Sequence, residues 1–397
     1  MGRAGLTLPL WLVITGLGIT QIIGWGTTFY ALGALSEDIA STTGWSKALI
    51  FGAFSAALLL SGLISPWAGR FVDRRGGRTL MMTGSLLAAL GLVVLGLFPN
   101  RVGYVAGWLV LGFAMRFATY DAAFASLTQI AGDRARRAIS YLTLFGGLAS
   151  TVFWPVSHFL SEAVGWPQTL LAYAALHILV CLPIHWAVLR EAKGEVASLG
   201  PAPEGHEPLS GTDRTKAMAL FAAVLSMNGL VFSSISAHVV PLFEGLGFAG
   251  GSAVTMAALI GPSQVASRLG EILLGRRLKA VHLGLIAFLL LPLALGIFAA
   301  GGFGVTAALI FAVLYGASNG LVTIAKGAVP LVLFGRKGYG EVLGILSAPQ
   351  LVLNAAAPLL FALLLGITSP QGALMIAGGA ALVSGLAMIW LARLHPR

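Results

Sequence analysis

Five charged side chains lie inside long apolar stretches of this sequence, and their chemistry is that of binding and pairing. Three are cations, Arg116, Arg268 and Lys326, and two are acids, Asp121 and Glu271. A charge in the core of a lipid bilayer costs on the order of 3 kcal/mol or more, so each one needs a partner or a water-filled cavity. A guanidinium group presents parallel N–H donors that match a carboxylate. The cations therefore predict a binding site for a small anionic ligand.

Pairing within the protein is the competing interpretation. Glu271 follows Arg268 by three residues, within reach on one helix face, and Asp121 is a second possible partner for Arg268. Asp121 follows Arg116 by five residues, about 140° around a helix, so the two do not share a face of a continuous helix. We expect each of them to meet another helix or the cavity. Lys326 can pair with Asp121 or contact the anion.

The two acids are also the candidates for proton coupling. Burial favours the neutral acid, whereas a nearby arginine favours the charged carboxylate. A proton carrier needs that balance, so we assign proton coupling to Asp121 or Glu271.

Uncharged polar residues in the same stretches add hydrogen-bonding capacity. We expect Gln21, Asn228 and Asn319 to contact the substrate, with hydrogen bonding between helices as the alternative. Gln350 and Asn354 are four residues apart and can line the same cavity, but we favour a role in joining helices.

The elements that position these residues are transmembrane helices. Of the 397 residues, 57% are hydrophobic and only 10% are charged, against about 25% charged in a soluble domain. Apolar segments long enough to cross roughly 30 Å of hydrocarbon recur along the chain. They predict an all-α membrane protein with twelve transmembrane helices, at 9–35, 46–69, 78–98, 103–131, 137–163, 167–190, 216–243, 249–274, 278–300, 303–332, 341–366 and 370–393.

The lysines and arginines orient these spans. If both termini are cytoplasmic, 19 of the 24 fall in cytoplasmic segments, two in external loops and three inside spans. Such an asymmetry is what the positive-inside rule requires. Removing one span would place every later loop on the opposite side of the membrane and destroy this asymmetry. The net charge of +10 is therefore explained by topology and not by nucleic-acid binding.

The chain divides into two similar halves. A shift of 203 residues aligns Gly132 with Gly335, Pro155 with Pro358, and Pro167-Gln168 with Pro370-Gln371. The polar segment 191–215 separates six predicted spans from six and is expected to be a cytoplasmic linker. We therefore predict two pseudo-symmetric six-helix bundles, at 1–190 and 216–397, as in transporters whose halves move around a central site.

A loop motif supports this architecture. The segment from Gly69 to Arg78 reads G-R-F-V-D-R-R-G-G-R between predicted spans 2 and 3, on the basic side. It resembles the G-x-x-x-D-R-x-G-x-R signature of the major facilitator superfamily. The resemblance implies a twelve-helix transporter and a role for this loop in conformational switching. It assigns that role to five residues, namely Gly69, Asp73, Arg74, Gly76 and Arg78.

Within that superfamily the chain looks most similar to the porters of monocarboxylates and of oxalate and formate. Gly44-Trp45-Ser46 and Gly261-Pro262-Ser263-Gln264, followed by Arg268, carry this resemblance. It implies that Arg268 binds the substrate carboxylate and that spans 1, 4, 7 and 10 line the cavity. This chain differs from the animal monocarboxylate porters at two positions. Gln264 stands where they have an aspartate, and Tyr30 lies near the place of their proton-handling lysine. We expect both side chains to lie in the substrate site.

These patterns predict a secondary transporter that works by alternating access and moves a small organic anion, coupled to protons or to anion exchange. The alternatives are an efflux antiporter for drug-like compounds and a non-transporting sensor built on the same fold. The sequence has no zinc-ligand spacing, Walker motif or dinucleotide fingerprint. We therefore expect no enzyme activity, cofactor or metal. A monomer in a bacterial inner membrane is the expected assembly and location.

Overall fold

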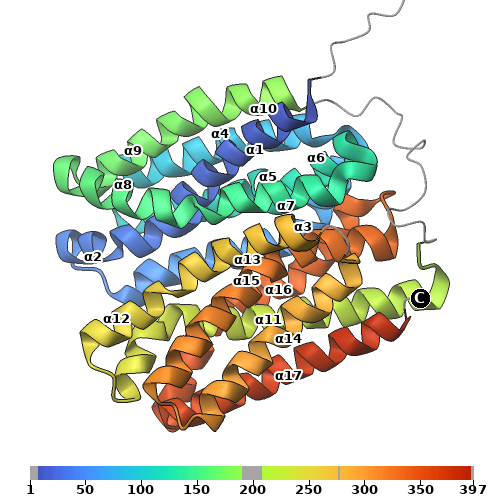
Figure 1. The fold of residues 1–397 in the computed structure, drawn as a ribbon. Coiled ribbons are helices and arrows are strands. Elements are labelled where there is room, and N and C mark those ends of the chain that lie inside the picture. The colour runs from blue at the N-terminus through green and yellow to red at the C-terminus, as the bar shows by residue number, and fades with distance from the viewer. Residues whose placement is uncertain (1–7, 190–207, 276–277, 395–397) are drawn as a thin grey trace, which may run out of the picture. The chain divides into compact units, whose positions relative to one another are not determined.

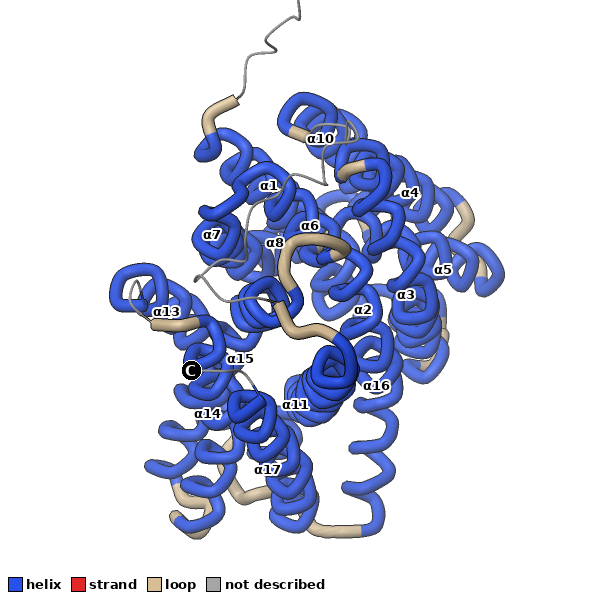
Figure 2. Tube along the Cα trace, turned by 90° about the vertical axis from the view of Figure 1, so that its right-hand side faces the viewer, coloured by secondary structure: helices blue, strands red, loops and turns tan. Residues whose placement is uncertain are grey.

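The computed structural model describes residues 8–189, 208–275 and 278–394, and their regular structure is entirely helical. The short connections are visible as the tan segments of Figure 2. Helices suit these sequences because every backbone N–H and C=O group in hydrocarbon must be satisfied within its own segment. Most of the predicted 191–215 linker, both chain termini and the pair Arg276-Arg277 lie outside the described residues.

The first half of the chain forms ten α-helices and three shorter helical segments among its described residues (Figure 1). In order they are α1 (Leu10–Trp25), the π-helix η1 (Gly26–Tyr30), α2 (Ala31–Thr43), α3 (Lys47–Arg75), α4 (Gly77–Leu97), α5 (Arg101–Ala118), α6 (Tyr120–Ala131), the 3-10 turn η2 (Gly132–Arg134), α7 (Ala135–Gly147), α8 (Ala149–Val164), α9 (Trp166–Leu176), the π-helix η3 (His177–Cys181) and α10 (Leu182–Val188).

The second half has longer uninterrupted helices. They are α11 (Gly211–Gly245), α12 (Gly250–Ala258), α13 (Ile260–Leu274), α14 (Ala280–Ala300), α15 (Val305–Phe334), α16 (Tyr339–Ile367) and α17 (Pro370–Leu394). Each coincides with a predicted span within a few residues, except that α12 and α13 divide the predicted eighth span.

Ten helical segments in the described part of the chain are long and apolar enough to cross a membrane. One of them, Arg101–Val164, has 64 residues, about three times the length that one crossing needs. It contains the turn η2, where Gly132 has φ +54°, a backbone conformation that favours glycine. α12 and α13 are each shorter than one crossing. Twelve crossings stay a prediction.

Contacts between Cα atoms divide the chain into two compact units. The first unit contains residues 1–53 and 68–200, and the second contains 54–67 and 201–397. The predicted six-and-six division stays a prediction: it places residues 54–67 of α3 in the first half and keeps 191–215 as a linker, whereas this grouping assigns 54–67 to the second unit and divides the linker after residue 200.

Residues related by the 203-residue shift occupy equivalent local positions. Gly132 and Gly335, at φ +54° and +77°, each end a helix in the left-handed half of backbone space. Pro155 and Pro358 both lie inside a helix. Pro167 and Pro370 both lie at the start of a helix. The repeat is therefore visible in the backbone at the residues that suggested it.

Candidate functional site

The predicted fourth span is not one helix. α5 ends at Ala118, Thr119 is extended at φ −95° and ψ −164°, and α6 begins at Tyr120. The segment from Arg116 to Asp121 contains neither proline nor glycine. Because both local helix breakers are absent, contacts from elsewhere must hold the helix open.

Arg116 and Asp121 form an ion pair across this break, through Nη1 and Oδ2. Both side chains are buried, each about 6% exposed. The expectation that they do not share a face was wrong, because it assumed a continuous helix. The extended residue Thr119 rotates α6 relative to α5 and brings the two side chains together.

Gln21 of α1 forms a hydrogen bond at the break between α5 and α6. Its Nε2 donates to the carbonyl oxygen of Ala118 at 2.9 Å, which in a continuous helix would bond the N–H four residues later. Gln21 is fully buried. Its Oε1 and the Nε of Arg116 have no hydrogen-bond partner among the described residues. Two predicted site residues thus keep unused polar atoms in the interior of the first unit.

Aromatic rings surround the break. Trp25 lies 5.2 Å from Tyr120 between ring centroids, and Tyr120 stacks on Phe124 at 5.2 Å. The π-helix η1 follows Trp25 and carries Phe29 and the predicted site residue Tyr30, whose rings are 5.4 Å apart. A π-helical turn inside an α-helix is frequent at functional sites.

Arg268 of α13 is the buried cation of the second unit, about 4% exposed. Its Nε donates to the carbonyl oxygen of Gly320, and its Nη2 to Thr323 Oγ1, both at 3.4 Å. These are long hydrogen bonds. Its Nη1 has no partner in the described chain. Among the described residues of this unit, no carboxylate lies within ion-pair distance of Arg268, so the alternative pairing with Glu271 is not formed.

Gly316 and Gly320 bring α15 close to α13. A Cβ at Gly320 would overlap Ser267 Oγ and lie 2.5 Å from the backbone oxygen of Gln264. Ser318, which lies between these two glycines, donates its hydroxyl to Ala287 O of α14 at 2.8 Å. Gly316, Ser318 and Gly320 therefore serve helix packing.

We expect Gly320→Ala to lower the free energy of unfolding by about 1–3 kcal/mol, because the new methyl group must push the two helices apart. Gly296→Ala is the matched control, since a Cβ there meets nothing within 4 Å. It should leave stability unchanged or raise it by up to about 1 kcal/mol. Unfolding of both variants in mixed detergent micelles measures the difference, and equal effects would contradict the packing role.

The remaining predicted polar residues of the second unit lie on three helices. Gln264, Asn319 and Lys326 are half-buried on α13 and α15, and Glu271 is half-buried one turn beyond Arg268. Asn228 of α11 is buried, and its Nδ2 has no partner among the described residues.

Asn354 has the role in helix joining that its spacing suggested. With its amide in the orientation that satisfies both atoms, it donates to Gly229 O of α11 at 3.0 Å and to Gln350 O at 3.1 Å. It therefore bonds α16 to α11.

The loop motif forms a tight connection between α3 and α4. Gly76 has φ +79°, and Gly77 is so close to Ser126 of α6 that a Cβ would overlap the hydroxyl. Arg78 donates through Nε to Leu189 O, after α10, at 2.7 Å. Asp73 is half-buried and Arg74 is exposed. Within the first unit, the motif thus joins α3 to α4 and brings α4 against α6 and the end of α10.

Sequence reasoning missed a polar stripe on the sixth span. Tyr173, His177, Cys181 and His185 follow one another at intervals of four and are all buried. The interval of four is the signal that could have revealed one helix face.

Hydroxyl groups of neighbouring helices bond this stripe. His177 Nε2 lies 2.8 Å from Thr27 Oγ1, and His185 lies 3.0 Å from Thr20 Oγ1. Each threonine gives its single proton to its own helix, at Ile23 O or Leu17 O. These two contacts join the sixth span to the first.

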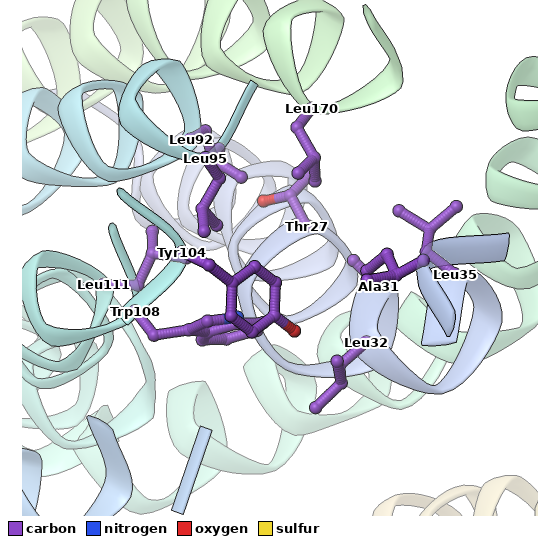
Figure 3. Close-up of a pocket in the computed structure, with 11 residues that line it drawn as sticks. Thr27, Ala31, Leu32, Leu35, Leu92, Leu95, Tyr104, Trp108, Leu111 and Leu170 are labelled. Atoms are coloured by element: carbon purple, nitrogen blue, oxygen red, sulfur yellow. The ribbon is translucent and has the colours of Figure 1, made fainter. Parts of the chain in front are cut away.

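An apolar recess lies beside Thr27 (Figure 3). Its wall consists mainly of leucines, with Tyr104 and Trp108 on one side. It has no charged side chain, so it does not fit an anion. The polar atoms at the break and at Arg268 are better candidates for substrate contact.

Comparison with known proteins is consistent with this geometry. The profile described as Major Facilitator Superfamily matches residues 17–269. Monocarboxylate transporter 11 of Mus musculus is 26% identical over 377 residues, covering 92% of this chain and 74% of the relative. The Homo sapiens protein of the same name is 26% identical over 375 residues, covering 92% and 70%.

Solved structures share the fold. The human organic anion transporter MFSD10 (TETRAN) superimposes with a TM-score of 0.74 at 17% identity, covering 96% of this chain and 99% of that one. The proton:xylose symporter XylE, bound to 6-bromo-6-deoxy-D-glucose, gives 0.74 at 12% identity, covering 96% and 95%. With the family profile matching most of the chain, this protein belongs to the major facilitator superfamily and is a multi-pass integral membrane transporter for a small-molecule substrate.

Proposed function

We propose that this transporter moves a small organic anion of the monocarboxylate type by alternating access, coupled to protons or to anion exchange. The observation that carries the proposal is Arg268. It is buried, it has an N–H group without a partner in the described chain, and no described carboxylate of its unit neutralises it. A buried guanidinium in that state favours a carboxylate ligand.

Arg116 is the second proposed contact with the anion, from the first unit. Its Nε is buried and has no partner in the described chain. The names of the relatives agree with an anionic substrate, because two are monocarboxylate transporters and one structural neighbour is an organic anion transporter.

Other predicted residues have proposed supporting roles. Gln21, Tyr30, Asn228, Gln264, Asn319 and Lys326 provide polar contacts around the substrate, and Glu271 is a second candidate for proton coupling beside Asp121. We also propose that the loop motif latches the two halves during switching, and that the protein is a monomer in a bacterial inner membrane.

The first test is a thermal-unfolding screen of the purified protein against small carboxylates, inorganic oxyanions and lipophilic efflux drugs. A ligand at about 100 times its dissociation constant stabilises the folded state by roughly 2.7 kcal/mol, which gives a visible shift of the midpoint. We expect one class of small carboxylate to shift it. If only lipophilic drugs did so, the arginines would be structural and the efflux alternative would replace this proposal.

A further inference from the structure

A cluster of aromatic side chains lies beside the break of the fourth span, within the first unit. It consists of Trp25, Phe29, Tyr30 and Tyr120, whose neighbouring ring centroids are 5.2 or 5.4 Å apart. We propose that this aromatic cluster packs against a ring of the substrate, so that the transported anion is an aromatic carboxylate. The inference rests on the proposed anion transport and names the chemical class of the substrate.

The aromatic cluster differs from an ordinary aromatic core in its exposure and its polarity. All four of its side chains are half-buried, and three of them are tryptophan or tyrosine. In the second unit, Phe243, Phe298 and Phe311 also pack ring against ring, but each is 0% exposed and none has a polar side-chain atom. Part of the surface of the aromatic cluster is therefore available to a ligand.

Unpartnered polar atoms lie beside these rings. Trp25 Nε1 is buried and has no hydrogen-bond partner among the described residues, although a buried indole N–H usually has one. Arg116 Nε, near the break, is a second such donor, and Gln21 Oε1, one turn before Trp25 on α1, is an unpartnered acceptor. A carboxylate offers only acceptors, so it can satisfy both donors.

Gly24 leaves open space next to Trp25. A Cβ built on Gly24 would meet no neighbouring atom within 4 Å. Gly26, two residues later on the same span, is different, because a Cβ there would overlap the ring of Phe153. Glycine is thus needed for close packing at Gly26 but not at Gly24. The space at Gly24 lies on the helix face of Gln21, three residues earlier, where a ligand can reach the unpartnered atoms.

A flat ring uses this arrangement better than an aliphatic group does. Aromatic pairs prefer offset-stacked or edge-to-face contacts, and these contribute beyond the burial of apolar area. The break places Tyr120 directly after the extended Thr119 and against Trp25. The ring contact and the donor of Arg116 therefore lie within five residues of the fourth span, so one ligand with a ring and a carboxylate can use both.

The decisive test compares benzoate with cyclohexanecarboxylate on the wild-type protein. Both are fully ionised at neutral pH and carry a six-membered ring, but only benzoate has a π face. We expect the dissociation constant of benzoate, measured by calorimetry, to be about two- to tenfold lower. Burial of apolar area alone predicts the opposite order, because the cyclohexyl group is the more apolar of the two. Equal affinities, or tighter binding of cyclohexanecarboxylate, would overturn the inference.

Substitutions of Trp25 locate the ring contact. Trp25→Leu should reduce the preference for benzoate toward equal affinities. Trp25→Phe keeps a ring but loses the N–H, so it should weaken both ligands by about tenfold or more and leave the preference unchanged. Trp11→Leu is the matched control, since Trp11 lies on the same helix, is 64% exposed and is not part of the aromatic cluster. It should change neither affinity.

A merely structural role of Trp25 would not change the ratio of the two dissociation constants. A Trp25→Leu protein with the wild-type ratio would therefore overturn the proposal. If Trp25→Leu does not fold, Tyr120→Leu removes the other ring of the pair and must lower the ratio instead.

Filling the space at Gly24 is an independent test. Gly24→Met should lose benzoate binding, because its side chain occupies the space proposed for the ligand. Gly33→Met is the control, since a Cβ at Gly33 also meets nothing within 4 Å and Gly33 is exposed on α2. Wild-type affinity for benzoate in Gly24→Met would contradict the proposed position of the ligand.

The outcomes separate the two proposals. If the wild-type protein binds no carboxylate, the proposed function fails. If it binds acetate or cyclohexanecarboxylate as tightly as benzoate, the proposed function stands and only the aromatic-substrate inference fails.

Discussion

Replacing Arg268 by alanine should abolish binding and transport of the carboxylate. The guanidinium is buried, and removing one partner of a buried charge-assisted contact typically costs about 2–5 kcal/mol, on the order of 100-fold in affinity or more. Uptake of the labelled anion into proteoliposomes, together with its dissociation constant, measures the effect.

Arg268→Lys serves as the matched variant. Lysine keeps the charge but loses the parallel donors of the guanidinium. We expect weakened binding with transport still detectable. An Arg268→Ala protein that transported every tested anion at the wild-type rate would remove Arg268 from the substrate site. Retention of the folded state is checked by the unfolding midpoint without ligand.

Arg116→Gln should be among the most destabilising single substitutions in the first unit. It leaves the buried carboxylate of Asp121 without the cation observed beside it. Removing one partner of a buried ion pair typically costs about 3–5 kcal/mol. Unfolding of the purified variant in mixed micelles, at a pH where acids are ionised, gives the change in free energy.

The double variant Arg116→Gln/Asp121→Asn, together with the two single variants, forms a double-mutant cycle. Removing both charges should recover much of the lost stability, since two neutral amides remain. Strictly additive effects of the single substitutions would show that the pair contributes nothing as a pair. This result concerns stability alone, so it stands whatever the transported substrate is.

The sequence was sufficient to predict the fold class because membrane insertion depends on local composition. An apolar segment of about twenty residues and a basic loop can each be identified from a continuous stretch of sequence. The structure confirms an all-helical chain with long apolar helices. Glycines that end helices could also be predicted, because a backbone conformation with positive φ, such as +77° at Gly335, favours glycine.

The loop motif could also be recognised from local sequence. Gly76 and Arg78 belong to a ten-residue signature, and the superfamily it suggested is confirmed by the family profile. Arg268 was singled out by its burial in an apolar stretch, and it is buried in the structure. The sequence could not show whether Arg268 pairs with Glu271 or with a ligand, because both partners lie within reach of its long side chain.

Tertiary structure alone decided how the charges pair. The break at Thr119 has no proline or glycine to announce it, and the group that stabilises it is the amide of Gln21, 97 residues away in sequence. Likewise, the threonine hydroxyls beside His177 and His185 come from the first span. The physical reason is the same in both cases. Burial of a side chain follows from the composition of its own segment, but a hydrogen bond or ion pair depends on which distant helix supplies the partner, and that is known only once the helices are packed.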